Sequence, residues 1–238
     1  MLNAASVTRA FEGVKAVDDL TLSVAPGELF CLLGANGAGK TTTINLFLGF
    51  LTPDAGSLTV GDVEPSIDPR SARRKLAYIP ENVALYPQLS GLENLQLFCR
   101  MGSSAKADEE LNELLHRTGL TPEQIRRPIA GYSKGMRQKV GLAIAYARGA
   151  QALLLDEPLS GLDPSAASDF CDELGRIREA GAAVLMTTHD LFRAKELGGT
   201  IGIMRAGRLV ETLNAQDVDA RDLERLYLHH MRRLEPKA

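Results

Sequence analysis

A glycine-rich segment near the N-terminus constrains the fold more than any other part of the sequence. Residues 34–41 read Gly-Ala-Asn-Gly-Ala-Gly-Lys-Thr, directly after the apolar run Glu28–Leu33 and directly before a helical pattern from about Lys40 to Leu48. Glycines permit the tight turn in which successive backbone N–H groups converge on one anion, and the helix start adds the positive end of its dipole. The spacing fits the P-loop pattern in full, which predicts a nucleoside triphosphate site on a strand–loop–helix unit.

The P-loop pattern assigns a role to each part of this segment. We expect Lys40 to reach the β and γ phosphates and the Thr41 hydroxyl to bind Mg²⁺. A chance glycine-rich turn is the alternative, and the strand and helix patterns on either side argue against it. The residues expected to contact the nucleotide here are Gly34, Ala35, Asn36, Gly37, Ala38, Gly39, Lys40, Thr41 and Thr42.

Two adjacent acids follow a second apolar strand. Ala152–Leu155 leads directly into Asp156, Glu157 and Pro158. Successive side chains of an extended chain point to opposite sides, so the two carboxylates can serve separate roles. We expect Asp156 to hold Mg²⁺ through water and Glu157 to orient or deprotonate an attacking water. Surface acids at a strand end are the alternative, and the four apolar residues that precede them argue against it.

Strand and helix patterns alternate along most of the chain. Short strands are expected at Ser6–Phe11 and Leu20–Val24, and a buried one at Glu28–Leu33. Helical spacing of leucines dominates from about residue 81 to 150, where Thr121 precedes Pro122 as a helix cap. After that stretch, strand and helix alternate again, which favours a mostly parallel sheet with helices on both faces. The later elements are expected at Ala152–Leu155, Asp163–Ala180, Ala183–Thr187, Leu191–Leu197 and Ile201–Arg205.

Three further motifs carry a family resemblance. Tyr132-Ser-Lys-Gly-Met-Arg-Gln138 begins an apolar helix about twenty residues before Asp156, Ser160–Asp163 follows the acids, and Thr188-His-Asp190 follows the next strand. In this order they match the signature, D-loop and switch histidine of ABC proteins. The sequence therefore resembles the ATP-binding subunits of ABC transporters over nearly the whole chain.

The resemblance implies an α/β P-loop NTPase fold. Its RecA-like, mostly parallel sheet would carry an N-terminal antiparallel β subdomain and an inserted helical subdomain. We expect one ABC ATPase domain over residues 1–238. Within it, residues 1–80 and 151–213 form the nucleotide-binding core, 81–150 the helical signature subdomain and 214–238 a C-terminal helical tail.

The resemblance also implies roles for residues outside the P-loop. Ser133 and Gly135 would contact the γ-phosphate held by a second subunit, and Asp163 of the D-loop would also belong to the nucleotide-binding residues. His189 would contact the γ-phosphate and the attacking water, and Phe11 would stack on adenine. The alternatives are an ordinary capped helix for Ser133 and Gly135, a plain surface or core histidine for His189, and a core aromatic for Phe11.

Two positions depart from the commoner family pattern. Glu81 follows the strand Leu76–Pro80 where many relatives have glutamine, and Lys134 replaces the usual glycine of the signature. Glu81 could still approach Mg²⁺, and Gln88 is a weaker candidate for that role. Both features resemble the ABC-2 export-type subfamily. The run Pro80–Gly91 is also similar to ATPases that assist copper-site maturation of nitrous-oxide reductase.

The composition of the chain limits the classes of partner that can be expected. A formal net charge of −3 gives no reason to expect nucleic acid. The apolar runs are far shorter than the ~20 residues of a membrane span, and the N-terminus lacks a signal-peptide pattern. Three separated cysteines favour a reducing cytoplasm. Together with the resemblance, this leads us to expect ATP and Mg²⁺ as ligands and a homodimer or pseudo-dimer of ATPase subunits. The expected partner is a multi-span membrane permease. The chain would contact the membrane only through this partner, at the inner face of the cell membrane.

Three other readings remain open. A soluble ABC-type ATPase of DNA repair or translation would carry two ATPase units or a long coiled coil, and neither pattern is present. A GTP-binding switch protein would need an Asn-Lys-x-Asp segment, which the chain lacks. A purely regulatory module is disfavoured because every catalytic position is filled. The tail Asp222–Leu234, with its adjacent His229 and His230, could bind metal, lipid or a second copy, or form a solvated terminal helix.

Overall fold

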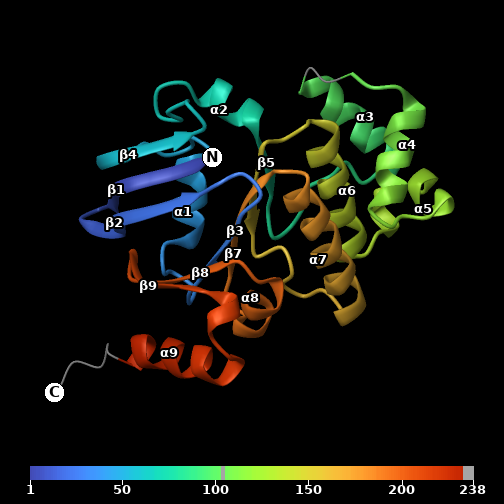
Figure 1. Cartoon of the computed structure of the whole chain (residues 1–238). Helices are drawn as coiled ribbons and strands as arrows, with labels where there is room; N and C mark the ends of the chain where they lie inside the picture. The colour runs from blue at the N-terminus through green and yellow to red at the C-terminus, as the bar shows by residue number, and fades with distance from the viewer. Residues whose placement is uncertain (103–104, 233–238) are drawn as a thin grey trace.

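A computed structural model describes residues 1–102 and 105–232 of the chain. The strands form two sheets, and most of the helices lie against the larger one (Figure 1). The smaller sheet is antiparallel with the order β2-β1-β4. Its strands are β1 (Leu2–Phe11), β2 (Val14–Val24) and β4 (Ala55–Val60).

The larger sheet has the order β5-β6-β7-β3-β8-β9. All neighbouring pairs are parallel except β8 and β9. The central strands are mostly apolar because other elements of the fold cover both of their faces. The strands are β3 (Leu29–Leu33), β5 (Leu76–Ile79), β6 (Ala152–Asp156), β7 (Ala183–Thr188), β8 (Thr200–Arg205) and β9 (Arg208–Asn214).

The helices fall into those that flank the sheet and a consecutive group between β5 and β6. Two short 3₁₀ turns also occur in the described residues. Ile129–Gly131 lies between two helices of the consecutive group, and Ala215–Asp217 precedes the C-terminal helix. The helices are α1 (Lys40–Phe47), α2 (Pro69–Lys75), α3 (Gly91–Met101), α4 (Asp108–Arg117), α5 (Pro122–Arg126), α6 (Lys134–Ala147), α7 (Pro164–Glu179), α8 (Leu191–Leu197) and α9 (Ala220–Arg232).

Alternate residues of the central strands build two separate cores. Leu32 and Leu154 join a cluster with α1 and the antiparallel sheet, whereas Leu33 and Leu155 join a cluster with α6 and α7. A third cluster holds the helices between β5 and β6 together, around Leu95, Leu111, Leu115 and Val140. The α/β fold with a mostly parallel sheet is confirmed.

The two N-terminal strands are longer than the sequence predicted. β1 and β2 have 10 and 11 residues, and their pairing shifts register between Ala4 and Val7 and again near Arg9. Ser6 and Asp19 have positive φ values of 50° and 54°. These irregularities interrupt the alternation of apolar and polar residues, so the pattern shows only fragments of each strand.

The prediction missed three elements, β4, α2 and β9. The missed helix α2 did carry a start signal: Asp68 accepts a hydrogen bond from the Ser71 N–H at 3.0 Å, and Pro69 fills the first helical position. With only seven residues, α2 is too short for a helical repeat of apolar residues to appear.

The C-terminal helix α9 docks on the larger sheet through one face. Leu223 is fully buried in the core beside α8, and His230 Nε2 lies 3.3 Å from the Glu211 carboxylate on β9. The helix begins at Ala220, after β9 and a short 3₁₀ turn at Ala215–Asp217. Residues 233–238, including Leu234, lie outside the described residues. Across the described part of the chain, no group of three or more His, Cys, Asp or Glu side chains could hold a metal.

The packing of α7 gives a first prediction. Phe170 is 1% exposed in the core between α7 and the sheet. Replacement by alanine should lower the free energy of unfolding by about 3–5 kcal/mol, because it removes buried apolar area and leaves a cavity. Denaturant titration followed by circular dichroism measures this. Phe192→Ala, at a side chain that is 67% exposed, is the matched control and should change stability little; equal stability losses in the two variants would contradict the packing described.

Candidate nucleotide site

Four strand ends bring the predicted site residues to one edge of the larger sheet. The P-loop follows β3, Asp156 ends β6, His189 follows β7 and Glu81 follows β5 by two residues. These four strands are parallel neighbours, so their carboxyl ends meet at the same edge. The fold thus brings together residues that are more than 150 positions apart in the sequence.

A hollow of about 560 Å³ opens at this edge. It has a size usual for small-molecule sites. Charged side chains and the exposed N–H groups of the P-loop surround it, as a triphosphate would require. Its lining residues are Phe11, Ala16, Ala35, Asn36, Gly37, Ala38, Gly39, Lys40, Thr41, Thr42, Glu81, Asp156 and Glu157.

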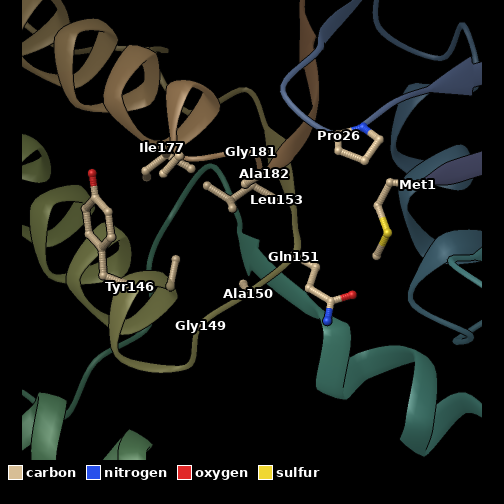
Figure 2. Close-up of a pocket in the computed structure, with 12 residues that line it drawn as sticks. Met1, Pro26, Tyr146, Gly149, Ala150, Gln151, Leu153, Ile177, Gly181 and Ala182 are labelled. Carbon is tan, nitrogen blue, oxygen red and sulfur yellow. The ribbon is translucent and has the colours of Figure 1, made fainter.

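A second hollow, of about 480 Å³, lies at the opposite ends of the strands (Figure 2). Figure 2 shows Met1 and Gln151 on one side of it and Tyr146 on the other. Its lining is mostly apolar and contains no charged side chain among the described residues. It therefore lacks the groups that would bind a triphosphate, and the hollow at the P-loop is the candidate site.

The P-loop backbone provides unused donors. Of the groups that the structure describes, the N–H of Gly37, Gly39, Lys40 and Thr41 donate to no protein acceptor. Gly39 has a φ of 109°, and a Cβ there would lie 2.3 Å from the Ala16 carbonyl oxygen, so only glycine fits. Four free donors at a helix start form a cradle for a phosphate group.

Lys40 is buried at this cradle. Its side chain is 6% exposed, and its Nζ donates to the Gly34 carbonyl at 2.6 Å and the Ala35 carbonyl at 3.3 Å. Nζ also lies 3.2 Å from Glu157 Oε1. In this structure the ammonium group is thus satisfied by the loop itself and by the acid that follows β6.

The Asp156 carboxylate is fixed by two hydroxyl groups. Thr41 Oγ1 donates to its Oδ2 at 2.9 Å, and Thr187 Oγ1 donates to its Oδ1 at 2.6 Å. Thr187 also accepts a hydrogen bond from the Glu157 N–H at 3.1 Å. One hydroxyl at the end of β7 therefore holds both acids in place.

Glu157 does not continue the extended strand, which corrects the expectation from the sequence. Its φ is 48°, in the left-handed region that non-glycine residues rarely adopt. This turn separates its carboxylate from that of Asp156 and directs it between Lys40 and His189. His189 Nδ1 lies 3.0 Å from Glu157 Oε2. The two acids still have separate partners, but a backbone turn rather than strand alternation separates them.

The residues expected to bind Mg²⁺ fit such an ion only together with a substrate phosphate. Thr41 and Asp156 are in contact through their hydrogen bond, and both are oxygen ligands. Mg²⁺ commonly takes one or two protein ligands and completes its shell with phosphate oxygens and water. The donor set agrees with that arrangement, and Mg²⁺ ligation stays a prediction.

Glu81 is paired with the signature segment. Its Oε1 lies 3.4 Å from Lys134 Nζ and accepts a hydrogen bond from Ser160 Oγ at 3.1 Å. Gln138 of α6 donates to the Glu81 carbonyl at 3.1 Å. The two departures from the family pattern, Glu81 and Lys134, are therefore ion-pair partners. Gln88 is exposed and does not line the hollow.

The signature residues do not line the hollow of their own chain. Ser133 caps α6 by accepting a hydrogen bond from the Met136 N–H at 3.2 Å. A Cβ at Gly135 would lie 3.0 Å from the Ala166 side chain, so α6 packs closely against the start of α7. Asp163 caps α7 in the same way, at 2.9 Å from the Ala166 N–H. Neither cap contributes to the P-loop hollow.

Phe11 lies at the rim of the hollow and is 41% exposed. The Arg9 guanidinium lies 4.9 Å from its ring centroid. An exposed ring in this place is not a core aromatic, and its stacking on adenine stays a prediction. Thr187 and Ala16 had no predicted role, and Ser160 was expected only as the first residue of the D-loop match. A hydroxyl at the end of the otherwise apolar strand β7 was the available signal for Thr187.

The comparisons with known proteins agree with this geometry. The ABC transporter family model matches residues 17–160, more than half of the chain. The chain belongs to the ABC transporter ATP-binding family. As a member of it, this ABC protein is an ATPase that binds ATP.

Curated relatives of this ABC ATPase come from several bacteria. An uncharacterized ABC transporter ATP-binding protein of Bacillus subtilis, YhcH, is 35% identical over 91% of this chain and 71% of its own length. The linearmycin resistance ATP-binding protein LnrL of the same species is 31% identical over 93% of this chain and 71% of its own length. A spermidine/putrescine import ATP-binding protein of Fusobacterium nucleatum is 32% identical over 88% of this chain and 56% of its own length.

Solved structures resemble this ABC ATPase along nearly its whole length. An ATP-binding subunit of an ABC transporter superposes with a TM-score of 0.85 at 28% identity and covers 98% of this chain and 100% of its own. A dimeric bacterial ABC transporter cassette superposes with a TM-score of 0.81 at 23% identity over 90% of this chain and 99% of its own. The second likeness shows the fold alone.

Thr187 provides a test of how the two acids are positioned. Thr187→Val keeps the shape of the side chain but removes the hydroxyl that binds Asp156 Oδ1 and the Glu157 N–H, which keeps only its hydrogen bond to the Thr187 carbonyl at 3.2 Å. The kcat for ATP hydrolysis should therefore fall by about tenfold or more. The KM for ATP should change much less, because Thr187 does not line the hollow. Thr187→Ser retains the hydroxyl and should restore most of the rate. A valine variant with unaltered kcat would contradict the role of this hydroxyl.

The Glu81–Lys134 pair provides a second test. Lys134→Gln leaves an unpaired carboxylate on the wall of the hollow, which should weaken ATP binding by about two- to tenfold through charge repulsion. Adding Glu81→Gln to that variant should restore the affinity, because the repelling charge is then gone. Calorimetric titration of the single and double variants gives the coupling. Additive effects of the two substitutions would show that the pair is not coupled to nucleotide binding.

Proposed function

We propose that this ABC ATPase energises transport by membrane subunits, through ATP-driven closure of two ATPase subunits. The proposal rests on one observation: within one chain, the P-loop and the start of α6, the two parts suited to bind a phosphate, lie apart from each other. The P-loop cradle has free N–H donors, and the capped start of α6 at Ser133 lies outside the same hollow. A second subunit can supply the missing helix start in a closed two-fold arrangement.

Hydrolysis follows from the groups at the sheet edge. With ATP in the cradle, Lys40 exchanges the Gly34 and Ala35 carbonyls and Glu157 for phosphate oxygens. Glu157 then accepts a proton from the attacking water while His189, 3.0 Å away, orients its carboxylate. Mg²⁺, held by Thr41 and Asp156, would neutralise charge on the phosphates. Ser133 and Gly135 of the opposing subunit complete the γ-phosphate site in this scheme.

Loss of the γ-phosphate removes the bridge between the two subunits. The energy for motion is then the difference between contacts made to ATP and contacts made to ADP. The paired residues Glu81, Lys134 and Ser160 join three mobile parts of such a switch, because they belong to the loop after β5, the start of α6 and the D-loop. We propose that the groove beside Glu81–Phe98 passes this motion to the membrane subunits.

The membrane partner is part of the proposal. In the part of the chain that the structure describes, no helix is long and apolar enough to span a bilayer. In this proposal a multi-span permease provides the path, with this chain at the cytoplasmic face of the membrane. Export of the ABC-2 type is favoured by Pro80–Glu81 and the Tyr132–Met136 form of the signature, and by the likeness to the linearmycin resistance protein. The importer-type relative shows that identity alone does not set direction.

The alternative function, a soluble ABC-type ATPase of DNA repair or translation, has less support. The family match and the curated relatives are transporter ATP-binding proteins. No basic stripe accompanies the net charge of −3. The resemblance of Pro80–Gly91 to copper-maturation ATPases has no counterpart among these relatives, so the proposal specifies no cargo.

The substitution Glu157→Gln tests the proposal. It should abolish turnover, because the amide cannot accept the proton of the attacking water, while ATP binding persists and the dimer accumulates. Hydrolysis assays and light-scattering mass measurements with Mg·ATP give the two readouts. Lys40→Ala should weaken ATP binding itself and yield no dimer. Wild-type turnover in the glutamine variant, or a monomer at saturating ATP, would overturn the mechanism.

A further inference from the structure

The exposed ring of Phe11 has an arginine over one of its faces. Arg9 and Phe11 are two residues apart at the end of β1, which lies between β2 and β4 (Figure 1). The carbon of the Arg9 guanidinium lies over the Phe11 ring, 4.9 Å from its centroid. The ring lines the nucleotide hollow, whereas Arg9 does not. Arg9 therefore lies behind the ring as seen from the hollow.

The segment between α1 and β4 holds the guanidinium in place. Arg9 Nη1 donates to Asp54 Oδ1 at 2.8 Å and to the Thr52 carbonyl at 3.2 Å. The same carboxylate accepts a hydrogen bond from the Ala10 N–H to its Oδ2 at 2.7 Å. In turn, the Asp54 N–H donates to the Thr8 carbonyl at 2.8 Å. Asp54 is thus fixed on β1 by its backbone and its side chain, and it holds Arg9 in one position.

One donor of Arg9 lacks an oxygen or nitrogen acceptor. Arg9 Nε is buried and has no hydrogen-bond partner within residues 1–102 and 105–232. A buried N–H donor without an acceptor costs free energy, and the electron-rich face of an aromatic ring offsets part of that cost. The contact with the Phe11 ring is therefore favourable for the guanidinium. It also favours one orientation of a ring that is otherwise partly exposed.

The Arg9–Asp54 ion pair contributes little to stability through its charges alone. The exposed fractions of the two side chains are 26% and 44%, and water screens ion pairs at such exposure. The pair instead supplies position, because a planar guanidinium held by two acceptors presents a fixed surface to an aromatic ring. This geometry favours a role in the placement of Phe11 over a role in folding.

We propose that Arg9 is a positioning residue for the nucleotide base. Its guanidinium covers one face of the Phe11 ring, and the adenine of ATP stacks on the opposite face. Because the ring is already held in place, less conformational entropy is lost when the base binds. The inference rests on the proposed function and on the predicted stacking. It adds the residue that prepares the base-binding half of the same site.

One continuous stretch of chain connects this support to the phosphate cradle. α1 begins at Lys40 in the P-loop and ends at Phe47, a length of about 12 Å. The chain then passes Thr52 and Asp54 before it enters β4. This short connection limits how far the cradle and the Arg9 support can move apart. A nucleotide contacts both parts, whereas a ligand without a base contacts only the cradle.

Two ligands separate base placement from phosphate binding. ATP carries the base, and inorganic tripolyphosphate does not. Arg9→Gln removes the cation behind the ring, so it should weaken ATP binding about three- to tenfold and change the affinity for tripolyphosphate by less than about twofold. Calorimetric titration of the full chain with Mg²⁺ measures both affinities. At saturating ATP the kcat should stay within about twofold of the wild type, so that the effect appears in KM.

A double-mutant cycle tests whether Arg9 acts through the ring. Phe11→Leu should weaken ATP binding by about fivefold or more, because the base loses its stacking partner. In the Phe11→Leu background, Arg9→Gln should have little further effect. Arg193→Gln is the matched control: Arg193 pairs with Glu196 at 2.6 Å, lies 6.0 Å from the Phe192 ring centroid and does not line the hollow. It should leave both affinities unchanged.

Asp54→Asn is a second variant, which keeps the test decisive if Arg9→Gln does not fold. Asparagine still offers an acceptor to the Ala10 N–H but removes the charge that holds Arg9, so ATP binding should weaken about two- to fivefold. Thermal unfolding checks that each variant is folded. Equal losses for ATP and tripolyphosphate would overturn the inference, because Arg9 would then act on the phosphates. Unchanged ATP affinity in the folded variants would overturn it as well.

The inference and the proposed function fail in different ways. Wild-type ATP affinity in Phe11→Leu would remove the stacking, and the role of Arg9 with it, but would leave hydrolysis and dimer closure untouched. A Glu157→Gln variant that stays monomeric at saturating ATP would instead refute the proposed closure. The comparison of ATP with tripolyphosphate would still report on Arg9 in that case.

Discussion

The arrangement of the nucleotide site depends on the buried ammonium group of Lys40. A charge that is 6% exposed must be surrounded by acceptors, and here these are two loop carbonyls and the Glu157 carboxylate. A γ-phosphate can replace all three acceptors at once. In the mechanism that we propose, ATP binding is an exchange of partners in which Glu157 loses its cation and becomes free to act on water. Lys40 would then link the binding of substrate to the release of the proposed base.

That exchange depends on how rigidly Glu157 is held. Its left-handed backbone conformation is a strained one for a residue with a side chain, and the surrounding contacts maintain it. The Thr187 hydroxyl binds its N–H, and His189 contacts the far oxygen of its carboxylate. Since Thr187 also fixes Asp156, β7 aligns the expected metal ligand and the expected base through a single side chain. The parallel arrangement of β6 and β7 makes this possible, because their ends are adjacent.

The sequence predicted most of the site because the P-loop and the acid pair are local patterns next to strongly apolar strands. It predicted the central strands and the helices of the third core for the same reason. Thr187 was missed because its role arises only from the pairing of β6 with β7, which a linear pattern does not contain. The contact between Glu81 and Lys134, 53 residues apart, was likewise invisible, although each residue was noted by itself. β1 and β2 were truncated where left-handed residues break the strand period.

Because Glu81 pairs with Lys134, the charges of these two residues have to be considered together. Each alone adds an unusual charge near a phosphate site, but together they are neutral and connect the loop after β5 to the start of α6. Gln138 adds a hydrogen bond between the same two segments. Since the side chains are partly exposed, this ion pair is weak enough to break and re-form during a cycle. A weak, reversible link suits a joint between the core and the signature helix, whereas the buried contacts of Lys40 and Asp156 suit groups that must keep their geometry.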